Sequence, residues 1–100
     1  MRTDTEITLL AQVNFAANVD APVLGELEKL VSAVRLEPGC IAYAAHTQAT
    51  DPRRVVFYER WESQAALDAH MAAPALAAFI AQIGPRLAGA PELTFLTRLG

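Results

Sequence analysis

The stretch FYERWESQAALDAH, residues 57–70, joins an alternating segment directly to a helical one. Phe57, Glu59 and Trp61 fall on one side of an extended chain, because side chains alternate with a period of two. Ser63 is a suitable N-cap for the helix that follows, and this helix can bring His70 toward the same space. The stretch therefore predicts a strand–helix junction that gathers a carboxylate, an indole and an imidazole.

Three further segments show the same strand pattern. Residues 7–15, 40–48 and 92–99 alternate in the way that residues 54–62 do, and this alternation is typical of strands. Residues 50–53 contain Asp, Pro and Thr, a composition typical of the turn in a hairpin.

Two helical regions separate the strands. Asp20 and Pro22 suit the first turn of a helix, and Pro38-Gly39 ends it. The apolar stripe expected to face the core comprises Leu24, Leu27, Val31 and Val34. The second region begins after Ser63 and is interrupted by Pro74, and its later stripe comprises Leu76, Phe79, Ile80, Ile83 and Leu87.

The resulting order, β-α-β-β-α-β, predicts an α+β ferredoxin-like sandwich in which residues 1–100 form a single domain. Both helices would cover one face of an antiparallel sheet. The other face carries apolar side chains at Leu10, Val56, Tyr58 and Leu96. Because these side chains need a cover, we expect a homodimer that packs sheet against sheet.

The composition indicates a packed globular protein, with 53% hydrophobic and 19% charged residues. The net charge is −3, and the eight Lys and Arg residues are scattered along the chain. A scattered distribution offers no basic stripe, so we expect no nucleic-acid partner.

Cysteine content and hydropathy suggest a location. Cys40 is the only cysteine, so no intramolecular disulfide is expected. The first residues, MRTDTE, do not resemble a signal peptide, and no apolar run reaches the ~20 residues that span a bilayer. These features predict a cytoplasmic protein without membrane contact.

Glu59, Trp61 and His70 are the candidate catalytic residues. Glu59 would be a buried acid with a raised pKa that accepts a substrate proton, or a strand-end carboxylate held by helix-start N–H groups or an arginine. His70 would act in proton transfer or orient the substrate, or it would be a half-buried structural histidine. Trp61 alone is most simply a core residue, but two titratable groups at one apolar cavity are typical of an active site.

The other polar residues suggest structural roles. His46, Tyr58 and Arg60 point to the open sheet face, and Cys40 has no His or basic neighbour in sequence that would activate its thiol. The sequence has neither metal-ligand spacing nor a Gly-rich phosphate loop or dinucleotide fingerprint. We therefore expect no metal and no cofactor.

Four segments carry a resemblance to a known family: EPGCIAY (37–43), YERWES (58–63), ALDAHM (66–71) and AAPALAAF (72–79). With them, nearly the whole chain resembles the antibiotic biosynthesis monooxygenase domain family, which includes small quinol monooxygenases. The resemblance implies a dimeric α/β barrel and a cofactor-independent monooxygenase. Such an enzyme oxidises an aromatic or hydroquinone-type substrate with dioxygen, in a pocket walled by Trp61 together with Tyr43, Phe57, Met71 and Phe79.

Haem degradation and a non-catalytic role are the two alternative functions. A related branch degrades haem, but its asparagine and its iron-ligand histidine fall here on Val13 and near Ile80, so this activity is disfavoured. Relatives often carry a polar residue or a histidine just after the Pro74 break, where this chain has Ala75-Leu76. That departure keeps open a non-catalytic, dimeric small-molecule-binding or stress-associated domain of the same fold.

Overall fold

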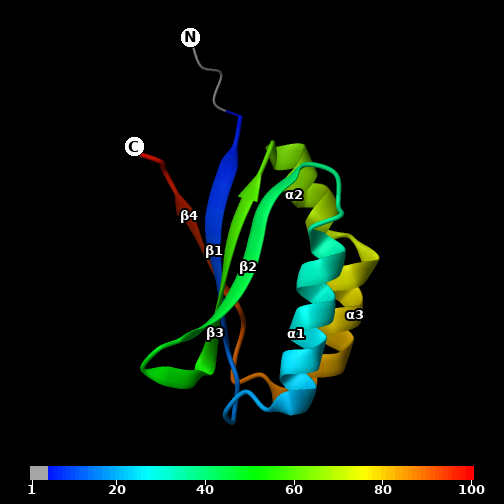
Figure 1. The fold of residues 1–100 in the computed structure, drawn as a ribbon, viewed down its shortest axis with the longest axis vertical. Helices are drawn as coiled ribbons and strands as arrows, with labels where there is room; N and C mark the ends of the chain where they lie inside the picture. The colour runs from blue at the N-terminus through cyan, green and yellow to red at the C-terminus, as the bar shows by residue number, and fades with distance from the viewer. Residues whose placement is uncertain (1–4) are drawn as a thin grey trace.

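An antiparallel sheet with the strand order β2-β3-β1-β4 forms one layer of the protein, and three α-helices form the other (Figure 1). The computed structural model describes residues 5–100. Its elements are β1 (Ile7–Asn14), α1 (Ala21–Val34), β2 (Cys40–Gln48), β3 (Asp51–Trp61), α2 (Gln64–Met71), α3 (Pro74–Ile83), a 3₁₀ turn (Gly84–Arg86) and β4 (Glu92–Leu96). The α+β ferredoxin-like prediction is confirmed.

Both predicted helix caps are present. Asp20 Oδ1 accepts a hydrogen bond from the backbone N–H of Val23 at 3.1 Å, which starts α1. Ser63 Oγ accepts from the N–H of Ala66 at 3.2 Å and starts α2 immediately after β3. These caps satisfy helix-start donors that would otherwise lack a partner. The cap at Ser63 also sets the position of His70 in the last turn of α2.

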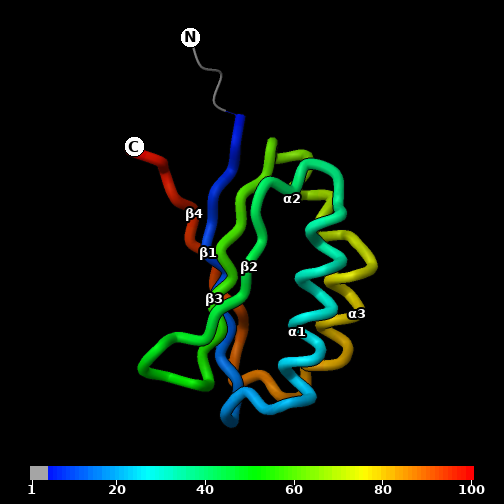
Figure 2. The backbone as a smooth tube through the Cα atoms, viewed as in Figure 1, coloured from blue at the N-terminus to red at the C-terminus, as the bar shows by residue number. Residues whose placement is uncertain are grey.

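The core lies between the two layers, and it leaves β4 largely uncovered. The trace in Figure 2 shows α1 and α3 side by side along the sheet, with β4 at the far edge from them. Leu93 and Phe95 pair with Ala11 and Leu9, so they belong to the helix-facing side of the sheet. Both are nevertheless exposed, because no helix reaches the edge strand.

The predicted stripe of α1 is wrong at its first residue. Leu24 is 52% exposed, and the residues of α1 that are buried are Val23, Leu27, Leu30 and Val34. These four residues lie three and four apart, so they form a continuous line on one side of the helix. Leu24 sits beside that line and borders a groove between α1 and β2. Ile80 in α3 is also exposed rather than buried.

Some predicted strand limits also differ. β3 begins at Asp51 rather than Arg54, because the hairpin turns within Ala49 and Thr50. β4 ends at Leu96 rather than Leu99. A register shift between Cys40 and Ala42 interrupts the alternation of β2, and Ile41 there is exposed although a strict period of two would place it on the same face as the buried Tyr43.

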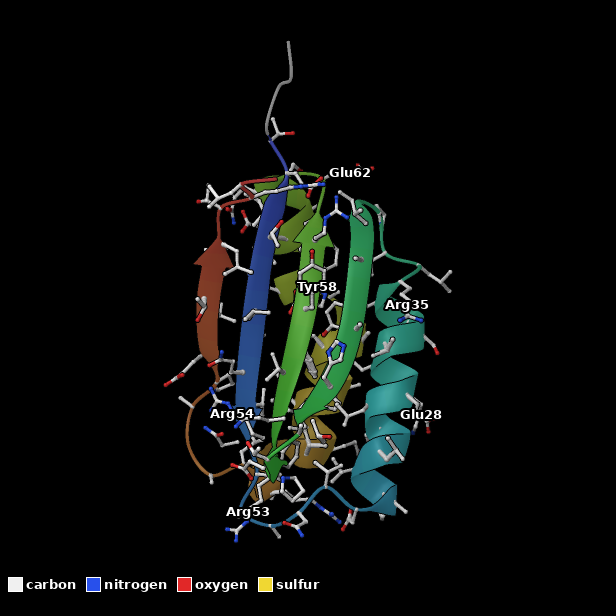
Figure 3. The ribbon with its side chains drawn as sticks, turned by 60° about the vertical axis from the view of Figure 1, so that its left-hand side comes forward. Glu28, Arg35, Arg53, Arg54, Tyr58 and Glu62 are labelled. Atoms are coloured by element: carbon white, nitrogen blue, oxygen red, sulfur yellow. The ribbon has the colours of Figure 1, made fainter. Side chains whose placement is uncertain are left out.

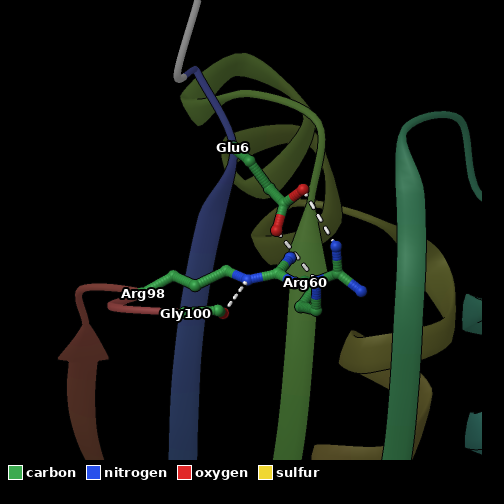
Figure 4. A network of polar contacts seen from close by, with 4 residues as sticks. All are labelled: Glu6, Arg60, Arg98 and Gly100. Carbon is green, nitrogen blue, oxygen red and sulfur yellow. Dashed lines mark hydrogen bonds and ion pairs between the residues drawn. The ribbon is translucent and has the colours of Figure 1, made fainter. Parts of the chain in front are cut away.

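The sheet face that points away from the helices is apolar in its centre and charged at its ends. Tyr58 projects from the middle of this open face (Figure 3). At one end Arg60 holds Glu6 through two hydrogen bonds of 2.8 and 3.0 Å (Figure 4). At the other end Arg54 donates to the Asn14 side chain at 3.0 Å. Each arginine thus connects β3 with the N-terminal strand region.

Among residues 5–100, no single helix is long and apolar enough to cross a membrane. The combination of α2 with residues 74–86 reaches the required length and composition, but only as a pair bent by 46°.

Candidate active site

A cavity of about 110 Å³ lies between the helix-facing side of the sheet and helices α2 and α3. All four predicted substrate-binding residues line it: Tyr43, Phe57, Met71 and Phe79. Glu59 contributes a carboxyl group to the cavity wall, and His70 contributes an imidazole. Nearly all the other lining residues are aliphatic or aromatic. The cavity extends toward the uncovered edge strand, where Leu93 and Pro91 border it.

Glu59 is only 4% exposed although it is ionisable. It lies near the end of β3 and pairs with Leu9 on one side and Tyr43 on the other. Burial raises the pKa of the Glu59 carboxyl above its usual range, and the nearby Glu37 raises it further. A hydrogen bond from Trp61 and the proximity of His70 act in the opposite direction. A buried carboxyl with a perturbed pKa beside an apolar cavity is typical of a functional site.

Only one oxygen of Glu59 is engaged by the protein. Oε1 accepts a hydrogen bond from the indole Nε1 of Trp61 at 3.0 Å. No other hydrogen bond to Glu59 forms within the described chain. Glu59 is therefore not a strand-end cap for helix-start N–H groups, and its Oε2 has no hydrogen-bond partner among the described residues.

Trp61 lies behind the cavity rather than in its wall. Its side chain is fully buried and is absent from the lining, which differs from its predicted place in the pocket. The indole ring stacks on the imidazole of His70 with centroids 4.6 Å apart and an angle of 27° between the rings. Trp61 therefore supports both Glu59 and His70, and it has no surface on which a substrate ring could stack.

His70 is 2% exposed and lies between two carboxylates. Its Nδ1 is 2.9 Å from Oε1 of Glu37. Its Nε2 is 3.9 Å from Oε1 of Glu59, which is longer than a hydrogen bond. The predicted convergence of Glu59 and His70 at one cavity is thus present in the structure.

Glu37 was not predicted as a site residue. It lies in the loop between α1 and β2, directly before Pro38-Gly39, and it is partly buried. Gly39 has φ +81°, and a Cβ atom there would lie 2.5 Å from the Cβ of Ala66. Only glycine lets the loop pack this closely on α2. The Pro-Gly turn was visible in the sequence, but no periodicity indicates that its neighbour reaches His70.

Tyr43 completes the polar part of the cavity wall. Its ring stacks on Phe57 at 5.6 Å and contacts His70 edge-on at 5.4 Å. Burial, followed by the charges of Glu59 and Glu37, raises the pKa of the Tyr43 hydroxyl well above its usual value. Tyr43 consequently stays protonated at neutral pH and can act only as a neutral hydroxyl.

The remaining candidates lie elsewhere. Burial raises the pKa of the Cys40 thiol, which argues against a nucleophilic role. His46 is on the open face, where its Nδ1 is 3.3 Å from the carbonyl oxygen of Val56. Within residues 5–100, no three His, Cys, Asp or Glu side chains gather as a set that could hold a metal ion.

The fold and the cavity together define a ferredoxin-like domain with a candidate small-molecule site, since an apolar pocket with a few converging polar groups is typical of such sites. Residues 7–82 match the family model described as antibiotic biosynthesis monooxygenase. The chain therefore belongs to the antibiotic biosynthesis monooxygenase family, as the sequence resemblance predicted.

Individual relatives agree with this membership. "Putative monooxygenase Rv0793" of Mycobacterium tuberculosis is 33% identical over 73 residues, which are 73% of this chain and 71% of that protein. Its solved structure superposes with a TM-score of 0.82 at 25% identity, over 95% of this chain and 96% of that chain. The structure of PA3566 from Pseudomonas aeruginosa superposes with a TM-score of 0.85 at 27% identity, over 100% of both chains.

"Uncharacterized protein sll1783" of Synechocystis is 36% identical over 59 residues. This chain spans only 40% of that relative, and the match includes 59% of this chain.

Proposed function

We propose that this protein is a cofactor-independent monooxygenase that oxidises a small phenol or hydroquinone with dioxygen. The observation that carries the proposal is Glu59, a buried carboxyl with a raised pKa at the wall of an apolar cavity. Its unengaged Oε2 would accept the proton of a substrate hydroxyl. A base whose pKa approaches the working pH is effective in such a transfer.

Loss of the hydroxyl proton makes the aromatic ring electron-rich, and the resulting phenolate can reduce dioxygen directly. For a hydroquinone, one oxygen atom of dioxygen replaces a ring hydrogen and the other leaves as water. The products are a hydroxylated quinone and one molecule of water, and the substrate supplies all four electrons. Because the substrate supplies the electrons, the protein has to deprotonate the substrate, orient it and exclude water.

The size of the cavity favours a substrate with one aromatic ring. Its volume is about 110 Å³, which is less than the ~150 Å³ of a dry cavity that holds a benzene molecule, so even a single hydroquinone ring would also occupy the open end beside Pro91 and Leu93. A second fused ring would have to extend past Met71 and Leu93 toward the uncovered edge strand. We therefore propose monocyclic hydroquinones as the preferred substrates.

Oxygen uptake with a panel of one-ring and two-ring hydroquinones tests this function. We expect uptake with one-ring members and one water formed for each quinone. Glu59→Gln keeps an acceptor for Trp61 but removes the base, so kcat should fall by roughly 10²–10⁴-fold. Glu28→Gln makes the same change at an exposed site on α1 and should leave kcat unchanged. No uptake by the wild-type protein with any member would reject the proposal.

The proposed assembly is a homodimer joined through the open sheet face. Three features of that face support it: an apolar centre at Leu10, Val56 and Tyr58, small residues at Ala42 and Ala44, and charged side chains at its ends, Arg60 paired with Glu6 and Arg54 bonded to Asn14. Small side chains on β2 let another sheet approach closely, and a second copy offers the same pattern in a two-fold arrangement.

A further inference from the structure

We propose that Glu37 is a positioning residue that fixes the tautomer of His70, so that the imidazole can take the substrate proton from Glu59 and return it later in the reaction. The inference rests on the proposed function, in which Glu59 takes a proton from the substrate. Glu37 does not line the cavity, so it would act through His70 rather than on the substrate.

The tautomer follows from the two contacts of the imidazole. An ionised carboxylate can only accept hydrogen bonds, so the 2.9 Å contact between Glu37 Oε1 and His70 Nδ1 requires the proton on Nδ1. In the neutral ring, Nε2 then carries a lone pair. Nε2, which carries this lone pair, lies 3.9 Å from Oε1 of Glu59.

This tautomer suits the transfer of a proton from Glu59 to His70. The substrate proton first resides on Glu59. It then moves to Nε2 of His70, which leaves Glu59 as a carboxylate ready for a new substrate. The imidazolium formed in this step has protons on both nitrogens, and Glu37 stabilises it by accepting a charge-assisted hydrogen bond from Nδ1.

The three groups lead from the cavity toward solvent. Glu59 lines the cavity, His70 is enclosed, and the side chain of Glu37 is 16% exposed. When the second oxygen atom leaves as water, Nε2 returns its proton through Glu59, and the ring is again protonated on Nδ1 with a lone pair on Nε2. For direct transfer, the Glu59 carboxyl must turn the oxygen that carries the proton toward Nε2, and the gap of 3.9 Å must shorten by about 1 Å.

The other titratable groups around His70 do not compete for this role. The hydroxyl of Tyr43 and the thiol of Cys40 both have raised pKa values, so they stay neutral while the proton moves. Arg35 donates to the backbone carbonyl of Tyr43 at 3.0 Å and is thereby held against β2. The stacked indole of Trp61 has no titratable group.

Nitrogen-15 NMR of the imidazole tests the inference without any substrate. In the wild-type protein above neutral pH, we expect the His70 signals of a ring protonated on Nδ1 and unprotonated on Nε2. Glu37→Gln offers both an acceptor and a donor to Nδ1, so we expect a mixture of tautomers. Glu28→Gln, the same change at an exposed site, should give the wild-type spectrum.

Turnover gives a second readout. With a one-ring hydroquinone, Glu37→Gln should lower kcat by about tenfold or more, as wrong tautomers do in other proton relays, while KM changes less than twofold because the cavity lining is intact. A His70 ring protonated on Nε2 in the wild-type protein would overturn the inference, even if Glu37→Gln fails to fold. A Glu37→Gln protein with wild-type tautomer and wild-type kcat would overturn it as well.

The two proposals fail in different ways. If the wild-type protein consumes no oxygen with any hydroquinone, the proposed function is rejected while the NMR result still reports on Glu37. If turnover is normal and the tautomer is independent of Glu37, the positioning role is rejected and the function stands.

Discussion

The indole Nε1–H of Trp61 donates a hydrogen bond to Oε1 of Glu59 at 3.0 Å, between two residues of β3 that share one face of the sheet. The bond satisfies the only polar atom of a fully buried indole. It also stabilises the anionic form of Glu59, and so lowers a pKa that burial raises. Trp61 therefore tunes the proposed base without entering the cavity.

Replacing Trp61 by phenylalanine should raise the pKa of Glu59. Trp61→Phe keeps an aromatic ring under His70 but removes the donor to the carboxylate, so the anion loses stabilisation. The pKa can be followed by carbon-13 NMR of the Glu59 carboxyl, and the acidic limb of the kcat/KM profile should move to higher pH. The smaller ring should also cost about 1–3 kcal/mol of stability. A carboxyl titration identical to wild type would contradict the proposed tuning.

Glu59 should make the stability of the fold depend on pH. Its folded pKa lies above the unfolded value near 4.5, so the folded protein holds this proton to higher pH than the unfolded chain does. The stabilisation is complete below that unfolded value and is lost as the pH rises through the folded pKa. Glu59→Gln stays neutral, so its free energy of unfolding should increase relative to wild type as the pH rises.

Urea unfolding of both proteins between pH ~4 and ~8 measures this difference in the free energy of unfolding. Glu28→Gln on the exposed side of α1 serves as the control and should show a flat difference. If the difference in free energy of unfolding between Glu59→Gln and wild type does not change with pH, burial does not raise the pKa of the Glu59 carboxyl.

Gly39 should be far less tolerant of alanine than Gly25. At Gly39, alanine would need φ near +81° and would place its Cβ 2.5 Å from that of Ala66. We expect a loss of about 1–3 kcal/mol and a displaced Glu37. At Gly25, inside α1, an added Cβ meets no atom within 4 Å. Gly25→Ala should therefore stabilise the protein by about 0.5–1 kcal/mol. Thermal unfolding of the pair measures both effects, and equal melting temperatures would contradict the prediction.

Filling the cavity should weaken substrate binding. Ala11 lines the cavity from β1, and leucine there would occupy part of the space of about 110 Å³. We expect Ala11→Leu to raise KM for one-ring hydroquinones by about tenfold or more, because losing room for even one methylene group costs ~1–3 kcal/mol. Ala81→Leu on the exposed side of α3 is the matched control. Unchanged KM in Ala11→Leu would place the substrate elsewhere.

The sequence allowed the fold to be predicted closely, because each strand had a period of two and each helix had a recognisable start. Asp20 and Ser63 are examples in which one side chain located a helix end correctly. The prediction from sequence was wrong where contacts with the packed elements, rather than the period of the sequence, decide which side chain is buried. Leu24 is exposed because the buried line of α1 runs through its neighbour Val23, and only the packed structure shows this.

The site could be predicted only in part. Alternation placed Glu59 on the helix-facing side, and the helix start at Ser63 brought His70 to the same cavity. The alternation of β3 predicts Trp61 in the cavity wall, because it lies on the same face as Glu59. In the structure the indole ring packs below His70 instead, behind the wall. Glu37 comes from a loop, and its contact with His70 depends on the close approach at Gly39, which no local pattern contains.

Introducing charge on the open sheet face should separate the proposed dimer. Tyr58 lies at its centre, where it pairs with Leu10 and Ala44. In a two-fold arrangement, Tyr58→Glu would bury two like charges without partners, which is strongly unfavourable. Light scattering at micromolar concentration should give the wild-type protein twice the chain mass of 10.8 kDa and the variant 10.8 kDa. Leu36→Glu replaces an apolar residue that is already exposed, so it should keep the wild-type mass. A wild-type mass of one chain would show that the open face needs no second copy to cover it.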